Sequence, residues 1–222
     1  AFALVFSPGP AFSQPAPVWH TADNTTANGT GTGMTINRPG NVATGNLIVV
    51  SIAMTANRTI TPPAGFSLVQ GTISNQISLY VYTKIATASE PSTYTFTNNT
   101  SATWRMAAGR VSGSHPTSPV PTGSGNISDN NANNATSITL TGITTTDANS
   151  LLVAALGFEV ATSGHTHTGM TQAWSAVTAP GNYGASQSIA SAGATGTRSV
   201  NWTTRSRVRT IMFSINRTVP SK

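Results

Sequence analysis

The chain of 222 residues contains no cysteine, which excludes disulfide bonds and thiolate metal sites. Charge is scarce as well: Asp, Glu, Lys and Arg make up 7% of the chain, whereas about a quarter is usual for a globular protein. Serine, threonine, asparagine and glycine fill the polar positions instead. This composition predicts a surface that forms hydrogen bonds but carries little charge. Such a surface is more typical of a rigid extracellular or particle-surface β protein than of a cytosolic enzyme.

Long apolar runs are also missing. None reaches the ~18–20 residues that a membrane helix needs, so we predict no membrane span. The opening AFALVF is apolar but short, and no basic residue precedes it. Both the remnant of a processed signal and the loss of an initiator methionine are compatible with it.

An internal repeat organises the chain. The apolar run at residues 46–55, rich in β-branched residues, predicts a strand that is buried on both faces or central in a sandwich. A second run of this type stands at residues 150–159. The matching apolar positions share an offset of 104 residues: Met34, Ile36, Leu47, Val49 and Ile52 with Ile138, Leu140, Leu151, Val153 and Leu156. Later the offset drifts to 106, which predicts that Phe96 and Trp202 are equivalent.

Alternating apolar residues and turn signals predict only strands, because the few stretches with helical period carry too many Thr, Ser and Gly. The predicted strands are 32–37, 46–55, 66–70, 76–85, 93–97 and 103–112, then 136–141, 150–159, 170–178, 183–191, 197–203 and 206–216. The predicted fold is all-β, an antiparallel β-sandwich that is jelly-roll-like and internally duplicated, with an extended N-terminal arm. The pattern leaves open whether the repeats form two sandwiches or one.

Composition also predicts the domain boundaries. Residues 1–31 form a strand at 1–6 and then a Pro-rich extended arm with Trp19 as its anchor; residues 32–113 and 136–222 are the two repeats; residues 114–135 are a linker rich in Pro, Gly and Asn. We expect Phe2, Leu4 and Phe6 to pair as a strand, in their own sandwich or in a neighbour's.

Several segments resemble a family of bacteriophage and prophage β-sandwich virion proteins. They are GNLIVVSI (45–52), TPPAGFSLV (61–69), LYVYTKIATASEP (79–91), YTFT (94–97) and AGATGTR (192–198). The chain departs from the family pattern at Asn46, where Asp is usual, and at Phe66, where Trp is usual. The resemblance covers about residues 32–216 and implies a structural part of a virion, with no residue-level map of function. Each segment also has a plain structural role: the two prolines and the glycine of TPPAG, for example, favour an extended entry and a turn before a strand.

Groups for catalysis are few. The five carboxylates are scattered, mostly in turns, whereas a glycosidase needs two that face each other. Glu159 with His165 or His167 is the only local acid–base candidate. The two histidines could also hold a metal ion with a third ligand from elsewhere, but two solvated histidines in a polar loop are the more common arrangement. Because no nucleophile elbow, phosphate loop or dinucleotide fingerprint occurs, we predict no catalytic residue, no metal site and no cofactor.

Arginine is the most distinctive polar group, and it makes the second repeat basic. Arg205, Arg207 and Arg209 alternate, as residues on one face of a strand do. Further along the strand, the residues that would point to the same face are apolar. Either the three arginines therefore lie beyond the sheet edge, or a bulge changes the phase of the strand. We predict that the basic residues contact a partner with an acidic surface, with ordinary solvated arginines as the alternative: Arg198, Arg205, Arg207, Arg209 and Arg217. Nucleic acid is disfavoured, since no aromatic residues are interleaved for base stacking.

These observations predict a non-enzymatic virion protein on the exterior of a phage particle, in capsid decoration or in a tail or fibre. Its partners would be other virion proteins and copies of itself, with a trimer favoured. One alternative is a carbohydrate-binding or host-adhesin module at a cell surface, for which a shallow groove lined by Trp or Tyr would be expected. The other is a secreted filament subunit that donates its N-terminal strand.

Overall fold

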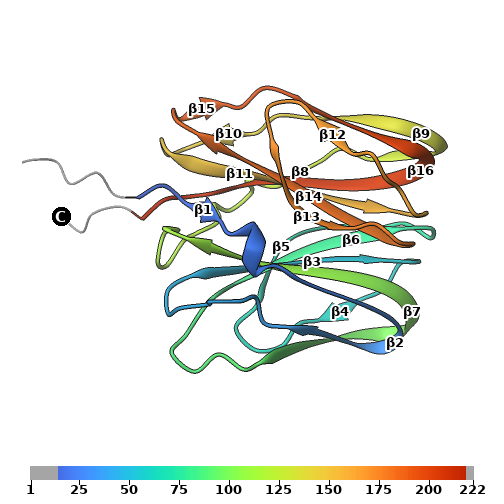
Figure 1. The fold of residues 1–222 in the computed structure, drawn as a ribbon, viewed down its shortest axis with the longest axis horizontal. Coiled ribbons are helices and arrows are strands. Elements are labelled where there is room, and N and C mark those ends of the chain that lie inside the picture. The colour runs from blue at the N-terminus through green and yellow to red at the C-terminus, as the bar shows by residue number, and fades with distance from the viewer. Residues whose placement is uncertain (1–14, 219–222) are drawn as a thin grey trace, which may run out of the picture.

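The computed structural model describes residues 15–218, which fold almost entirely into antiparallel strands in two packed seven-stranded sheets (Figure 1). The first half contains β1 (Val18–Trp19), a 3-10 turn (Thr21–Asp23), β2 (Thr25–Asn37), β3 (Leu47–Met54), β4 (Ile60–Thr61), β5 (Ser67–Thr72), β6 (Ser78–Ile85) and β7 (Thr93–Ser112). The second half contains β8 (Asn126–Ile127), β9 (Asn130–Leu140), β10 (Thr144–Thr145), β11 (Ser150–Phe158), β12 (Thr166–His167), β13 (Thr171–Ala176), β14 (Gly181–Ile189), β15 (Gly193–Ala194) and β16 (Arg198–Ile215). The predicted all-β antiparallel sandwich is confirmed. Among the described residues, no helix is long and apolar enough to span a membrane.

The two sheets have the same strand order. The first runs β7–β3–β6–β5 with β2 on the outer side of β7, and the second runs β16–β11–β14–β13 with β9 beside β16. The register repeats as well: Leu47 lies opposite Val111, and Leu151 lies opposite Ile215, each 104 residues later. Even the break in pairing between β2 and β7, which falls between Gly31 and Gly33, recurs between β9 and β16, where it falls between Ala135 and Ser137. The two halves therefore repeat one unit.

The central strands β3 and β11 are buried along their whole length, as the apolar runs predict. Their side chains alternate between two apolar layers, because successive residues of a strand point to opposite faces. In β3, Ile48 and Val50 face a core within the first half, whereas Leu47 and Val49 face the other sheet. In β11 the corresponding residues face a core within the second half and the same shared layer. Each half thus has its own core, and the two sheets share one apolar layer between them, here called the inter-sheet layer.

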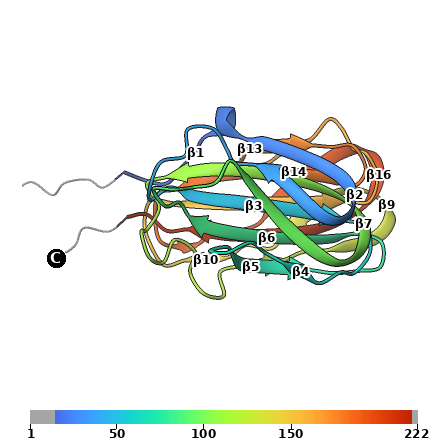
Figure 2. The ribbon, with the colours of Figure 1, turned by 90° about the horizontal axis from the view of Figure 1, so that it is seen from below.

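Two long strands close the separate cores. Strand β7 continues through residues 98–102, where two strands were predicted, and β16 likewise continues through 204–205. Figure 2 shows β7 and β2 running side by side and twisting across the molecule. The first part of β7 thereby carries Tyr94 and Phe96 over Val50 and Tyr82, where they complete the core of the first half.

Strands β2 and β9 begin earlier than predicted, at Thr25 instead of residue 32 and at Asn130 instead of residue 136. They therefore begin inside the predicted arm (1–31) and linker (114–135). The early part of β2 has no buried residue; Thr, Asn and Gly dominate it, and Asn and Ala make up the early part of β9. Backbone pairing with β7 and β16 holds these strands in place, so their side chains carry no apolar alternation.

The predicted equivalence of Phe96 and Trp202 is wrong by two residues, although both side chains are buried. Phe96 lies opposite Met34, and the counterpart of that pair is Val200 opposite Ile138. A slip of two residues keeps every side chain on the same face of a strand, so matching apolar residues cannot reveal it.

Candidate interaction sites

The structure does not place the five predicted partner-binding arginines on one surface. Arg205 is exposed, Arg198, Arg207 and Arg217 are half-buried, and Arg209 is buried. The pairing of β16 with β9 shifts between Asn201 and Val208, but Trp202 and Val208 both face the core of the second half, so the phase of the strand is the same on both sides of the shift. Arg198 donates to the Gln187 side chain and to two backbone carbonyls, and Arg207 forms an ion pair with Glu159 at 2.7 Å. Of the five, only Arg205 has an exposed side chain.

Arg209 joins the two halves from within. Its Nη1 lies 2.7 Å from Asp129 Oδ2, and its Nε donates to the carbonyl of Ile77 in the first half. Arg105, which stands 104 residues earlier, donates from Nε to the carbonyl of Pro180 in the second half at 3.1 Å. Ile77 and Pro180 directly precede β6 and β14, so the two arginines make equivalent bonds in opposite directions. This reciprocal pair fixes one sheet against the other.

Asn182 forms a fully buried polar centre in the inter-sheet layer. Its Oδ1 accepts hydrogen bonds from Ser51 Oγ at 2.9 Å and from Trp174 Nε1 at 2.8 Å. Its Nδ2 donates to the carbonyls of Ser51 and Arg105. A buried amide with all its partners in place rigidifies a core. The sequence gives no sign of this role, because the Pro-Gly-Asn segment (180–182) that contains Asn182 has the composition of a turn.

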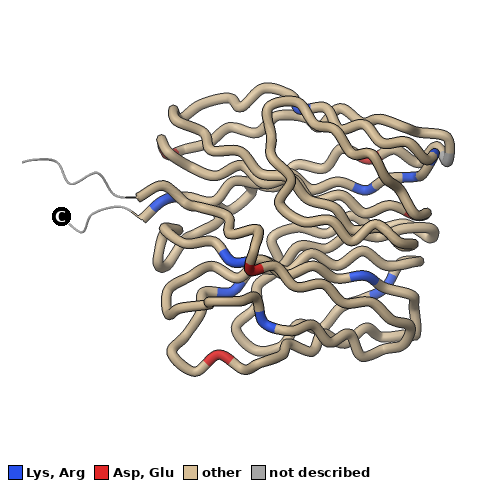
Figure 3. The backbone as a smooth tube through the Cα atoms, in the orientation of Figure 1, with Lys and Arg blue, Asp and Glu red and all other residues tan. Residues whose placement is uncertain are grey.

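Most carboxylates serve the fold, and charges are sparse along the chain (Figure 3). Four of the five carboxylates form ion pairs: Asp23 with Arg110, Glu90 with Lys84, Asp129 with Arg209, and Glu159 with Arg207. The Arg110 guanidinium hydrogen-bonded to Asp23 holds the pKa of that carboxyl below its usual value. Glu159, the predicted acid–base candidate, is thus engaged with Arg207.

Glu90 is the most perturbed carboxylate. Burial alone would raise its pKa, but hydrogen bonds from Lys84, Thr87 and Tyr94 outweigh that effect and lower the pKa to about 2. The carboxylate thereby ties the end of β6 to the start of β7. Its role is that of a buried cap on the turn at residues 86–92.

The histidines near β12 pack against aromatic rings. His165 stacks on Tyr183 with ring centroids 4.3 Å apart, and its Nε2 lies 3.0 Å from Thr162 Oγ1. Burial lowers the pKa of His165, and the neighbouring His167 lowers it further. No group of three potential metal ligands occurs among residues 15–218. This geometry is that of a neutral, packed imidazole.

The segment before β2 lies on the second half. Trp19 stacks on Trp174 with ring centroids 5.1 Å apart, and Asn24 Nδ2 donates to the carbonyl of Ala173 in the edge strand β13. Trp19 is the described part of the predicted arm site; Phe2, Leu4 and Phe6 lie outside the described residues. Beside this contact is an open groove of about 370 Å³, lined by polar Thr171, Gln172 and Gln187 together with Trp19.

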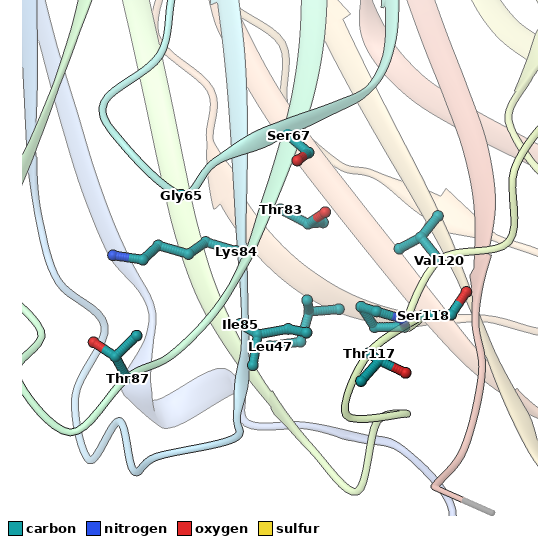
Figure 4. A pocket seen from close by; sticks show the side chains of 11 residues that line it. Leu47, Gly65, Ser67, Thr83, Lys84, Ile85, Thr87, Thr117, Ser118 and Val120 are labelled. Atoms are coloured by element: carbon teal, nitrogen blue, oxygen red, sulfur yellow. The ribbon is translucent and has the colours of Figure 1, made fainter.

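A second groove lies at the start of β3 and the end of β6 (Figure 4). Its volume is about 400 Å³, and the loop at residues 117–120 forms one wall. Leu47, Ile85 and Val120 supply its apolar lining, and Ser67 at the start of β5 borders it. Lys84 lines the groove with its stem, because its ammonium group is paired with Glu90.

Comparisons with models of protein families, with curated proteins and with solved structures found no match to this chain.

Proposed function

We propose that this chain is a non-enzymatic structural protein on the exterior of a bacteriophage particle, in capsid decoration or in a tail or fibre. Protein–protein contacts hold it there, with other virion proteins and with copies of itself. The resemblance of the TPPAGFSLV and ATASEP segments to phage virion proteins supports a location on a phage particle. The architecture supports a structural role.

One observation supports the structural role: the charged side chains form contacts within the protein that make it rigid. Four carboxylates pair with basic groups, and Arg105 and Arg209 bridge the two halves. The exposed positions of edge strands such as β2 and β9 carry Thr, Asn and Ala, which gives a polar coat with little charge. Such a coat limits clumping between particles, and many copies on one particle would make weak individual contacts hold together.

The test is mass spectrometry of particles purified from a host that carries this gene. We expect the chain at a fixed copy number relative to the major capsid or tail protein. Absence of the chain from washed particles would overturn the proposal.

The groove beside Trp19 favours one alternative, a carbohydrate-binding or adhesin module, because amide and hydroxyl groups line it. Against this alternative, Trp19 stacks on Trp174 with one face, and its ring lies over Gly109, so little aromatic surface is free for a sugar. Saturable binding of a defined glycan by the isolated chain, lost in Gln172→Ala, would favour the alternative. Glycan binding that Gln172→Ala leaves unchanged would not support a site in this groove.

A further inference from the structure

The edge strands of the two sheets occupy equivalent positions but differ in chemistry. Strand β5 ends the first sheet and β13 ends the second, and each pairs on one side only. At equivalent places in the pairing, β5 carries Leu68, which is 53% exposed, and β13 carries Gln172. Ile73, directly after β5, is also 53% exposed. An unpaired strand edge with exposed apolar side chains is a template for another strand.

The apolar groove of Figure 4 extends the exposed edge of β5. Ser67 borders the groove, and Leu68, the next residue, points to the opposite face of the sheet. A strand added to β5 would therefore place alternate side chains against Leu68 on one face and toward Val120 on the other. The groove beside β13 also contains Val18, Trp19 and Leu151, but the edge position that corresponds to Leu68 is Gln172 there, so of these two edges only that of β5 offers apolar contacts on both faces.

We propose that the outer edge of β5 and this groove bind the apolar segment at residues 1–6 of a second copy of the chain, which adds as a strand. The segment AFALVF has no charge and no proline, and Phe2, Leu4 and Phe6 alternate with smaller side chains. Main-chain hydrogen bonds would supply affinity, and the alternate side chains would supply specificity. The segment has six residues, as β5 has. The inference does not depend on where the assembled protein is located.

The surroundings of Pro15 favour a second copy over the same chain. The carbonyl oxygen of Pro15 lies beside Gly113, a few residues before the groove wall at 117–120 in the sequence. Both described ends of the chain lie at this end of the molecule (Figure 1). Residues 7–17 contain Pro8, Pro10, Pro15 and Pro17, and a Pro-rich spacer extends by about 3.1 Å per residue and bends poorly. A spacer of this composition would favour a site on a neighbour over the nearby site of its own chain.

The absence of cysteine allows a direct test. One full-length chain carries Leu68→Cys, and a second carries Phe2→Cys, Leu4→Cys or Phe6→Cys. After mixing and thiol oxidation, we expect a disulfide between different chains for at least one of the three positions, identified by mass spectrometry. The matched control replaces Leu68→Cys by Gln172→Cys on the other edge. The proposal is overturned if no position links to residue 68, if residue 172 links as well as residue 68, or if a chain with both cysteines links only within itself.

Sedimentation of the native chain gives a second, independent readout. Leu68→Lys places a charge on the edge of β5, and we expect it to raise the dissociation constant of the oligomer about ten-fold or more, as the loss of one apolar contact would. Gln172→Lys should leave the dissociation constant unchanged, and both variants should unfold as the parent does. Equal effects of the two substitutions, or a parent chain that stays monomeric at high concentration, would overturn the proposal.

Discussion

At the scale of single residues, Arg209 shows where sequence reasoning stops. The alternation of Arg205, Arg207 and Arg209 predicts a shared basic face, yet only Arg209 is buried, with 6% of its surface exposed, because it follows the parity of Ile211 on the face of the inter-sheet layer. Parity alone does not show how far along β16 the other sheet covers this face, so the sequence cannot tell which of the three arginines is buried. The partner of Arg209, Asp129, lies in a segment whose composition is that of a linker.

Replacing Arg209 should therefore destabilise the fold. Arg209→Met leaves Asp129 without its partner and removes the bond to Ile77, so we expect the free energy of unfolding to fall by about 3 kcal/mol. Arg205→Met, at the exposed position, should change it by less than about 0.5 kcal/mol. Urea unfolding monitored by fluorescence measures both. Similar small effects of the two substitutions would mean that Arg209 does not join the halves.

The lowered pKa of Glu90 predicts that the fold loses stability in acid. Its pKa is about 2 in the folded protein against 4.5 for a free glutamate, so its stabilising contribution is complete above pH 4.5 and is lost as the pH falls from 4.5 to 2. Glu90→Gln should lower stability at neutral pH and flatten the profile in this window. Lys84→Met should move the loss to higher pH, because it removes a hydrogen bond that lowers the pKa. Parallel profiles of parent and Glu90→Gln between pH 4.5 and 2 would refute this role.

At the scale of elements, the sequence predicts those strands that bury side chains and misses those held by backbone alone. The runs at 46–55 and 150–159 predict β3 and β11 to within two residues, because burial requires apolar side chains. The early parts of β2 and β9 bury little, so nothing in their composition marks them. Both misses fall at equivalent places in the two halves and have the same cause.

The contact of β1 with the second half depends on a glycine. A Cβ built at Gly109 would lie 2.1 Å from Trp19 Cζ2, so Gly109→Ala should displace the Trp19 ring and cost about 1–3 kcal/mol. The cost should largely vanish in a Trp19→Ala background, giving a coupling of about 1 kcal/mol or more in a double-mutant cycle. Gly33→Ala is the matched control, since nothing lies within 4 Å of its Cβ. Additive effects of the first two substitutions would show that the ring does not lie over Gly109.

At the scale of the whole molecule, the two halves should unfold together. Leu47 and Leu151 belong to one inter-sheet layer, so separating the sheets would expose the apolar faces of both. We expect a single calorimetric transition. A variant whose only tryptophan is Trp104, in the first half, and a variant whose only tryptophan is Trp202, in the second half, should show the same midpoint of unfolding. Two separate midpoints would mean that each half is stable without the shared layer.

Under the proposed function, a doubled β unit locked by internal ion pairs is presented in many copies on a phage particle. Electron microscopy of intact particles tests this most directly. We predict two-sheet densities of this shape at regular positions on the outer surface, at the stoichiometry found by mass spectrometry, and their loss from particles made without the gene. Particles whose outer surface is unchanged when the gene is deleted would contradict the account.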